Sequence, residues 1–392
     1  MENIAIEMIF KKYIFYLMIS FKKKIQQISN ITLISIVLLI SINFLLGWVW
    51  EIRTNIKFKN FEPYDEIVRK SLSLNKKDAL ILFFETHVTA ERYEYAPYLG
   101  YAENQGYDYK FVNVSAELGR KTISPFLCKK NIFLYGGSTT FGAGVTDDQT
   151  IASYLGQILI DNKKNICVKN YGRRSYYSFQ ESILLQKHIL KETIKPNDII
   201  IFLDGINEIG YRDPKNTNLL TQLFSISNQR YWNMQDIGFL VFLDSLTINQ
   251  FVKVLLKKND KKNTNEPKKI YTKDYFENIK ITLENNIIFR ENICKSYDLS
   301  CYNLLQPFAT IHGMYFEKQI GGVNKSFVND KDSIKFLKKR WDTLKEAKGV
   351  TNISDALENS KKLGYVDRVH YSPYANKRIA EKIFNIAFKD ID

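Results

Sequence analysis

The stretch Tyr135–Gly142, YGGSTTFG, decides the fold that we predict for this chain. It follows the apolar run NIFLY at 131–135 and leads through two glycines into three consecutive hydroxyl residues. Such a cluster is common in turns, and it also fits a serine nucleophile presented at the end of a strand. Partners elsewhere in the chain decide between the two interpretations.

The chain after NIFLY alternates between short apolar runs and amphipathic segments. The predicted strands are 131–135, 166–172, 198–205 and 301–308. The predicted helices are 147–159, with Asp147 or Asp148 as N-cap, 178–194, 275–296 and 372–388. Because strands alternate with helices, we predict an α/β fold with three layers, in which a parallel sheet carries helices on both faces.

An uncharged stretch of twenty residues, Ile31–Trp50, has the length of a membrane-spanning helix. Five lysines precede it, whereas Arg53, Lys57 and Lys59 follow it, which favours a cytoplasmic N-terminus. We therefore predict a single-pass membrane protein whose catalytic domain is extracytoplasmic, in a periplasm or at a cell surface. No small-x-small pattern follows the run, which argues against a cleaved signal peptide.

This organisation gives four predicted parts. Residues 1–30 form a cytoplasmic or interfacial segment, 31–50 the transmembrane helix and 51–130 an irregular lead-in that packs on the catalytic domain. The lead-in contains ALILFF at 79–84, a strand candidate. The catalytic domain covers 131–392, with a helical insert at about 211–267.

The formal net charge of +14 favours anionic partners, but compact basic motifs with interleaved aromatics are lacking, so we predict no nucleic-acid binding. Neither a cofactor nor a metal is expected, because the four cysteines are scattered and no histidine accompanies them at ligand spacing. If the domain is extracytoplasmic, Cys128–Cys167 and Cys294–Cys301 are the favoured disulfides. Free buried cysteines are the alternative.

The loops that follow parallel strands meet at one edge of the sheet. Ser138 follows the first strand, Gly172 the second and Asn207 the third. Acyl transfer through a serine also needs a base and a carboxylate that orients it. Asp367 and His370, three residues apart in VDRVHYSP, supply both.

With these four blocks in order, the sequence resembles the SGNH (GDSL-like) hydrolase family, a flavodoxin-like α/β/α fold, from about 131 to the C-terminus. The matching motifs are GGSTTFG, NYGRRS, DGINE and DRVH. The family's usual Gly-x-Asn-Asp is here Gly205-Ile206-Asn207-Glu208, which differs at the last position. An α/β-hydrolase is disfavoured because the second glycine of Gly-x-Ser-x-Gly is missing.

The resemblance implies a Ser-His-Asp triad in which Ser138 is the nucleophile, His370 the base and then the acid, and Asp367 the orienting carboxylate. It also implies an oxyanion hole formed by the backbone N–H groups of Ser138 and Gly172 and by the Asn207 amide. The remaining histidines, His87, His188 and His312, match no catalytic block, so we interpret them as structural.

The implied activity is that of a serine esterase that removes or transfers O-acetyl or other short acyl groups on carbohydrate. A transferase would need a partner membrane protein or an acylated molecule as donor, because one span forms no conduit for acyl groups. A lipid-directed esterase or lysophospholipase is one alternative, and a catalytically silent glycan-binding or assembly protein is another.

Overall fold

The computed structural model describes most of the chain from residue 62 onward and part of the segment before it. The described residues are 18, 20–24, 26, 29–35, 37–38, 41–46, 48, 62–88, 93–94, 96, 98–103, 106–115, 119–125, 127–210, 273–309, 331–358, 362–367 and 369–388. They belong to two compact units, one formed by 1–61 with 228–269 and the other by 62–227 with 270–392.

In the first unit, the described residues between 18 and 48 are helical. Among the residues that the structure describes, no helix combines the length and the apolar character needed to cross a bilayer. The predicted span 31–50 is described only in part, and the predicted insert at 211–267 lies outside the described residues. Both therefore stay predictions.

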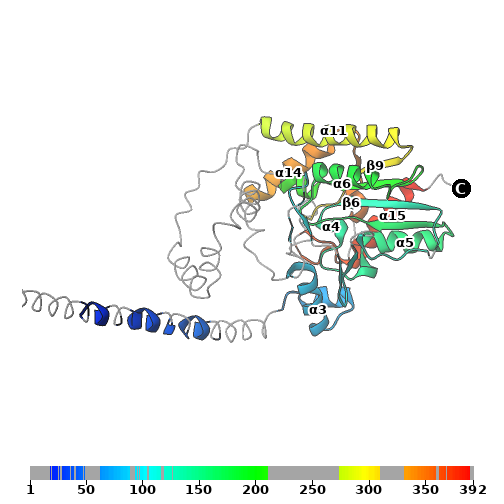
Figure 1. The fold of residues 1–392 in the computed structure, drawn as a ribbon. Helices are drawn as coiled ribbons and strands as arrows, with labels where there is room; N and C mark the ends of the chain where they lie inside the picture. Colours follow the sequence, from blue (N-terminus) through cyan, green and yellow to red (C-terminus); the bar gives the residue numbers. More distant parts are fainter. Residues whose placement is uncertain are drawn as a thin grey trace, which may run out of the picture. The chain divides into compact units, whose positions relative to one another are not determined.

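The second unit is built on an eight-stranded sheet in the order β10-β9-β8-β6-β7-β5-β4-β3 (Figure 1). Its parallel strands are β6 (Lys130–Gly136), β7 (Ile166–Asn170), β8 (Ile199–Asp204), β9 (Ser300–Leu305) and β10 (Thr351–Asn352). The four predicted strands are thus confirmed and β10 is an addition. Numbered along the chain, these five strands lie in the order 2-1-3-4-5, the order of flavodoxin-like folds.

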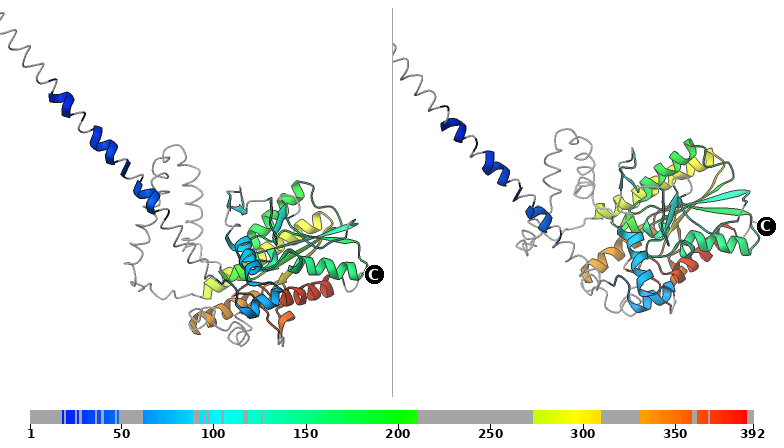
Figure 2. Two further views of the ribbon diagram at one scale, coloured as in Figure 1. Left: turned by 90° about the horizontal axis from the view of Figure 1, so that it is seen from below. Right: turned by 60° about the horizontal axis from the view of Figure 1, so that its bottom comes forward.

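Helices cover both faces of the sheet (Figures 1 and 2). The helices α5 (Ile151–Asp161) and α15 (Pro373–Ala387) lie on one face, and α6 (Ser178–Leu190) and α11 (Lys273–Ser296) on the other. Side chains alternate along β6, so that Ile132 and Leu134 join the core with α5 and α15, while Phe133 and Tyr135 join the core with α6. Every residue of β8 is buried, as expected for a central strand covered on both faces.

Five further elements of this unit follow β6 along the chain. They are α4 (Ser138–Phe141), the 3-10 helix η3 (Asp147–Gln149), α7 (Ile206–Gly210), α14 (Lys331–Lys345) and the 3-10 helix η5 (Ser354–Leu357).

The start of α5 differs from the prediction. Neither Asp147 nor Asp148 caps it, because Asp147 already accepts hydrogen bonds from Arg120 Nε (2.9 Å) and from Asn113 Nδ2 (2.7 Å). The helix begins at Ile151, and the N-cap is Thr150, which accepts from Ser153 N–H at 3.1 Å.

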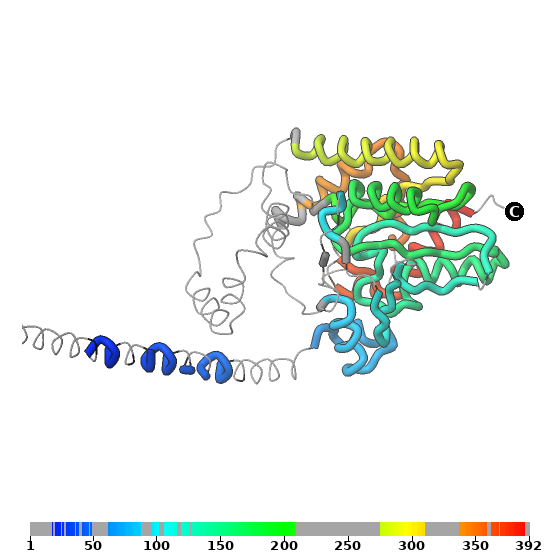
Figure 3. The backbone as a smooth tube through the Cα atoms, viewed as in Figure 1, coloured from blue at the N-terminus to red at the C-terminus, as the bar shows by residue number. Residues whose placement is uncertain are grey.

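The lead-in is more regular than predicted. It contains α2 (Glu66–Leu72), α3 (Lys76–Phe83), the π-helix η1 (Phe84–Val88), β1 (Tyr93–Glu94), β2 (Ala102–Glu103), β3 (Tyr107–Asp108), β4 (Asn113–Ser115) and β5 (Gly119–Arg120). Strands β3 to β5 extend the main sheet in antiparallel fashion, whereas β1 and β2 form a separate pair. The backbone of the described part of the lead-in can be followed in Figure 3.

ALILFF, predicted as a strand, lies in α3 and the first residue of η1, so that prediction is wrong. The Asn75 side chain accepts from Asp78 N–H at 2.9 Å, and this N-cap starts the helix. Its apolar side Ala79 and Leu82 is buried in a core shared with Phe141, which follows β6. Packing against the sheet domain therefore overrides the strand propensity of the run.

The described cysteines are all paired. Cys128–Cys167 joins the start of β6 to β7, and Cys294–Cys301 joins the end of α11 to β9, with Cα–Cα distances of 5.5 and 6.2 Å. The favoured pairing is confirmed, and the alternative of free cysteines is wrong.

Candidate active site

The candidate site lies where β6 and β8 end. The chain leaves β6 toward its neighbour β7 and later leaves β8 toward β9 on the other side, which makes this edge the topological switch point of the sheet. Ser138 is the first residue of α4, two residues after β6, and Asn207 lies in α7 directly after β8. The sheet order therefore brings together two residues 69 positions apart.

The geometry of the nucleophile turn depends on Gly137. Its position packs so closely on the loop after β8 that a Cβ there would overlap the amide nitrogen of Asn207. Only a glycine permits this approach, so Ser138 and the Asn207 amide share one side of the turn.

Ser138, His370 and Asp367 form a continuous chain of hydrogen bonds. The Ser138 Oγ lies 2.9 Å from His370 Nε2, and His370 Nδ1 lies 2.6 Å from Asp367 Oδ2. With the Nδ1–H donating to the carboxylate, Nε2 is left to accept the serine proton. These are the relations that a general base and its orienting carboxylate require.

The loop that carries Asp367 and His370 is held rigidly. Asp367 Oδ1 accepts the backbone N–H groups of Val369 and His370, each at 2.8 Å, and Val366 N–H donates to the carbonyl of His370 at 2.9 Å. An antiparallel bridge between Tyr365 and Tyr371 closes the loop. The imidazole is therefore placed by its own loop, which limits its freedom to leave the serine.

Gln306, which follows β9, connects the nucleophile turn to this loop. Its Oε1 accepts from Thr139 Oγ1 at 2.7 Å, and its Nε2 donates to the carbonyl of Leu203 at 2.9 Å. The same Oε1 lies 3.1 Å from Tyr371 OH, whose nearer acceptor is the carbonyl of Pro307. Thr139 is adjacent to Ser138, and Tyr371 is adjacent to His370. Gln306 is buried and was not identified from the sequence, because no pattern marks it there.

Electrostatics keep Asp367 ionised. Partial burial would raise the pKa of its carboxyl, but the charge of His370, its hydrogen bond and the two backbone N–H donors outweigh burial and hold the pKa well below its usual range. The carboxylate thus remains an anion that fixes the imidazole tautomer and stabilises the imidazolium formed during attack.

Two of the three predicted oxyanion donors lie at or beside the nucleophile turn, and their role stays a prediction. The N–H of Ser138 lies in the first turn of α4, where backbone N–H groups have no partner within the helix. Asn207 Nδ2 donates one hydrogen to the carbonyl of Tyr176, which orients the amide, and a second hydrogen belongs to the same group. The Asn207 amide comes from α7 and lies against Gly137, the residue before Ser138.

Gly172 has a different place. Its N–H donates to the Asn170 side chain at 3.0 Å, and Asn170 in turn donates to the carbonyl of Thr140 at 3.0 Å. A Cβ at Gly172 would overlap the backbone of Thr140 and Phe141. The structure therefore gives Gly172 a packing role against the nucleophile turn, and its part in the oxyanion hole stays a prediction.

Glu208, the residue that departs from Gly-x-Asn-Asp, anchors the loop after β8. Its two carboxyl oxygens accept the backbone N–H groups of Ser178 at 2.5 Å and of Gly205 at 2.7 Å. Burial, together with the neighbouring charge of Asp204, raises the pKa of Glu208 to about 7, against these hydrogen bonds. The longer acidic side chain thus links the Asn207 loop to the start of α6.

Beneath this loop a single buried cation faces several carboxyl groups. Arg290 is fully buried, and its guanidinium donates to Asp204 at 2.6 Å and to Glu181 at 3.2 Å. Its plane also lies 3.8 Å over the Phe202 ring. Burial raises the pKa of Glu181, and the charge of Asp204 raises it further. The cluster fixes α6, α11 and β8 relative to one another below the site.

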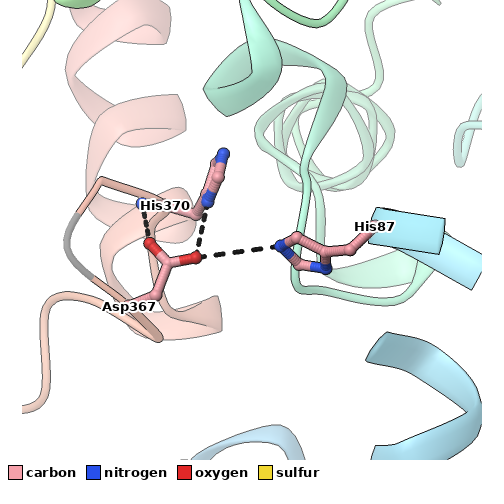
Figure 4. Close-up of side chains that lie close together, drawn as sticks. All are labelled: His87, Asp367 and His370. Atoms are coloured by element: carbon pink, nitrogen blue, oxygen red, sulfur yellow. Dashed lines mark hydrogen bonds and ion pairs between the residues drawn. The ribbon is translucent and has the colours of Figure 1, made fainter. Parts of the chain in front are cut away.

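His87 reaches the triad from η1 of the lead-in (Figure 4). Its Nε2 lies 3.9 Å from Asp367 Oδ2, and its ring meets that of His370 edge to face at 5.8 Å between centroids. Burial and the His370 charge lower the pKa of His87 to about 4, so its imidazole is neutral above that pH. The interpretation of His87 as merely structural missed this position, since 280 residues separate it from Asp367.

The other two histidines differ from His87. His188 lies in α6, where its Nδ1 and Tyr135 OH are 2.7 Å apart, which agrees with a structural role. His312 lies outside the described residues.

Several solved structures are similar to this chain over about two thirds of its length. A lipase from a goat rumen metagenome is 13% identical, with 67% of this chain and 100% of that chain covered and a TM-score of 0.39. A lipolytic protein of the G-D-S-L family from Veillonella parvula is 10% identical, with 67% and 100% covered and a TM-score of 0.37. The acetylxylan esterase Axe2 from Geobacillus stearothermophilus is 12% identical, with 68% and 97% covered and a TM-score of 0.33. No family model and no curated protein matches the chain. Identities and TM-scores this low do not assign an activity to it.

Proposed function

We propose that this chain is a serine ester hydrolase of the SGNH type. The single observation that carries the proposal is the hydrogen-bonded series Ser138–His370–Asp367 at the switch point of the sheet. Each group has the partner that its role requires, and the Asn207 amide lies against Gly137, the residue before the nucleophile.

The proposed reaction has two halves. As Ser138 Oγ attacks the ester carbonyl carbon, its proton passes to His370 Nε2, and the Ser138 N–H and the Asn207 amide stabilise the oxyanion. The bond from carbon to the alcohol oxygen then breaks, and His370 protonates the leaving alcohol. Water, deprotonated by His370, attacks the acyl-serine and releases the carboxylic acid and free Ser138. If an acceptor hydroxyl replaces water, the same site transfers the acyl group.

For the substrate we propose short acyl esters, above all O-acetyl groups on carbohydrate. This choice rests on the sequence resemblance and on the proposed location, and a lipid ester is the competing substrate class. We also propose that the N-terminal segment anchors the chain in a membrane with the catalytic unit on the extracytoplasmic side. Both described disulfides support that location, because disulfides persist in oxidising compartments.

The test is ester hydrolysis by the full-length protein on p-nitrophenyl esters of acetate, octanoate and palmitate. Ser138→Ala should abolish turnover, whereas Ser296→Ala, at an exposed serine at the end of α11, should leave it unchanged. Highest kcat/KM on acetate, with acetate release from acetylated oligosaccharides, would support the carbohydrate substrate. Highest kcat/KM on palmitate would favour the lipid substrate. Turnover that survives Ser138→Ala, or a folded wild-type protein that is inert on every ester and acceptor, would contradict the proposal.

A further inference from the structure

His87, Asp367 and His370 bring three metal-ligating side chains together beside the proposed nucleophile. One ligand atom of each lies within 4.8 Å of the others. The side chains are 27%, 33% and 16% exposed, so an ion from solvent can reach them. Figure 4 shows His87 approaching the carboxylate from the side of the lead-in, while His370 contacts it from its own loop.

The orientation of His87 is set by its own helix turn. Its ring stacks on Phe83, with centroids 4.6 Å apart and planes 15° from parallel. Its Nδ1 lies 2.8 Å from Thr86 Oγ1 and 3.3 Å from the carbonyl of Phe83. These contacts occupy Nδ1 and leave Nε2 directed toward Asp367 Oδ2.

In the tautomer that carries its hydrogen on Nδ1, His87 donates toward Thr86 Oγ1 and the carbonyl of Phe83. Nε2 then presents an unshared electron pair to a carboxylate oxygen 3.9 Å away, beyond hydrogen-bonding distance. A cation between these two atoms would select that tautomer.

We propose that His87 and Asp367 form an inhibitory site for a divalent transition-metal ion of the Zn²⁺ type. Zinc binds imidazole nitrogen and carboxylate oxygen at about 2.0–2.2 Å, so two of its tetrahedral ligands lie about 3.4 Å apart. The two atoms need approach by only about 0.5 Å from the observed 3.9 Å. An imidazole ligand selects zinc-like ions over Mg²⁺ and Ca²⁺, which prefer all-oxygen sites.

Binding at this position interferes with the triad. Asp367 Oδ2 is the same oxygen that accepts from His370 Nδ1 at 2.6 Å, which is closer than two ligands of one ion can lie. The ion must therefore draw the carboxylate away from His370, and its charge opposes the imidazolium that forms during catalysis. The ion is thus an inhibitor and takes no part in the reaction.

The inhibition rests on the proposed esterase activity, whereas the binding does not. Zinc binding is therefore measured first on full-length Ser138→Ala, stripped with a chelator, by calorimetric titration with ZnCl₂ and with MgCl₂. We expect one Zn²⁺ per chain and no heat from Mg²⁺. Adding His87→Phe, which preserves a ring over Phe83, should weaken zinc affinity at least about tenfold, the lower bound for losing even an outer-shell partner. The matched control is Asp355→Asn, at an exposed carboxylate that pairs with Lys382, and it should bind zinc like the parent.

A second measurement does not depend on the folding of a His87 variant. In full-length Ser138→Ala, Zn²⁺ should slow the modification of His87 by diethyl pyrocarbonate, followed by peptide mass spectrometry, whereas Mg²⁺ should leave the rate unchanged. An unchanged rate at His87, or equal zinc affinity in the folded His87→Phe variant, would overturn the proposal.

In the wild type, Zn²⁺ should inhibit hydrolysis of p-nitrophenyl acetate, and EDTA should restore the activity. The His87→Phe variant should need a higher Zn²⁺ concentration for half-maximal inhibition. If the protein binds zinc through His87 but has no esterase activity, the proposed function is refuted and the zinc site is supported. If the protein is an active esterase but does not bind zinc, the zinc site is refuted and the proposed function is supported.

Discussion

Replacing Glu208 with glutamine should change how stability depends on pH. Glu208 is buried and accepts two backbone N–H groups, from Ser178 and Gly205. Its pKa is raised from 4.5 to about 7, first by burial and then by the charge of Asp204. Glutamine has nearly the same size but cannot ionise, so the variant isolates the cost of a buried charge.

The sign and size follow from proton linkage. Since the pKa is higher in the folded state, the folded protein binds more protons than the unfolded chain between pH 4.5 and about 7, and stability falls as pH rises through that window. At 1.36 kcal/mol per pH unit, this fall amounts to about 3 kcal/mol. Glutamine removes this dependence of stability on pH. It also lowers the free energy of unfolding by about 1–3 kcal/mol at all pH values, because its single carbonyl oxygen cannot accept well from both N–H donors. The Glu208 charge also raises the pKa of Glu181, so its removal flattens the profile further.

The assay is urea unfolding of wild type and Glu208→Gln at about pH 5, 6, 7 and 8 and constant ionic strength. Fluorescence can report it, because Trp341 is fully buried against Phe308. From the lowest to the highest pH, the free energy of unfolding of the variant should rise by about 3 kcal/mol relative to that of the wild type. Glu346→Gln, at an exposed position, serves as control. Profiles of wild type and Glu208→Gln that run parallel would refute the reasoning, because they would mean that Glu208 ionises in the folded state as it does in the unfolded chain.

Three further predictions concern the site and its support. Asp367→Asn should lower kcat about 10⁴-fold with little change in stability, because the amide favours the wrong imidazole tautomer; stopped-flow ester hydrolysis and thermal unfolding measure the two effects, and a loss below tenfold would contradict the role. Gly137→Ala should lower kcat about 10²- to 10³-fold by displacing the Asn207 amide while KM changes little; an unchanged kcat would exclude Asn207 as an oxyanion donor. Replacing both Cys128 and Cys167 with serine should cost about 4 kcal/mol in urea unfolding, because their bond closes a loop with a sequence separation of 39; no loss under non-reducing conditions would mean that the bond does not form.

The strands and part of the candidate site were predictable from the sequence for the same reason. Buried parallel strands read as short apolar runs, and their carboxyl ends are where functional loops gather, so Ser138 and Asn207 could be placed together from chain order. Asp367 and His370 precede the last helix, and they were identified from the chemistry that a serine nucleophile requires and from the family resemblance. The strand prediction for ALILFF was wrong because its helix depends on the Asn75 cap and on burial against Phe141. His87 was not recognisable as a neighbour of Asp367, because only the packing of the lead-in brings it there.

The order of the triad along the chain has a consequence for biosynthesis. The nucleophile lies 232 residues before its base, and that base is positioned by a loop directly ahead of α15, which completes the core over β6. During synthesis Ser138 and the strand before it emerge long before His370. A nascent chain therefore carries a serine without its base, and the proposed attack on esters requires that α15 has docked. The proposed esterase activity would then report that the C-terminal segment has folded onto the sheet, and it would serve as a folding assay with no spectroscopic probe.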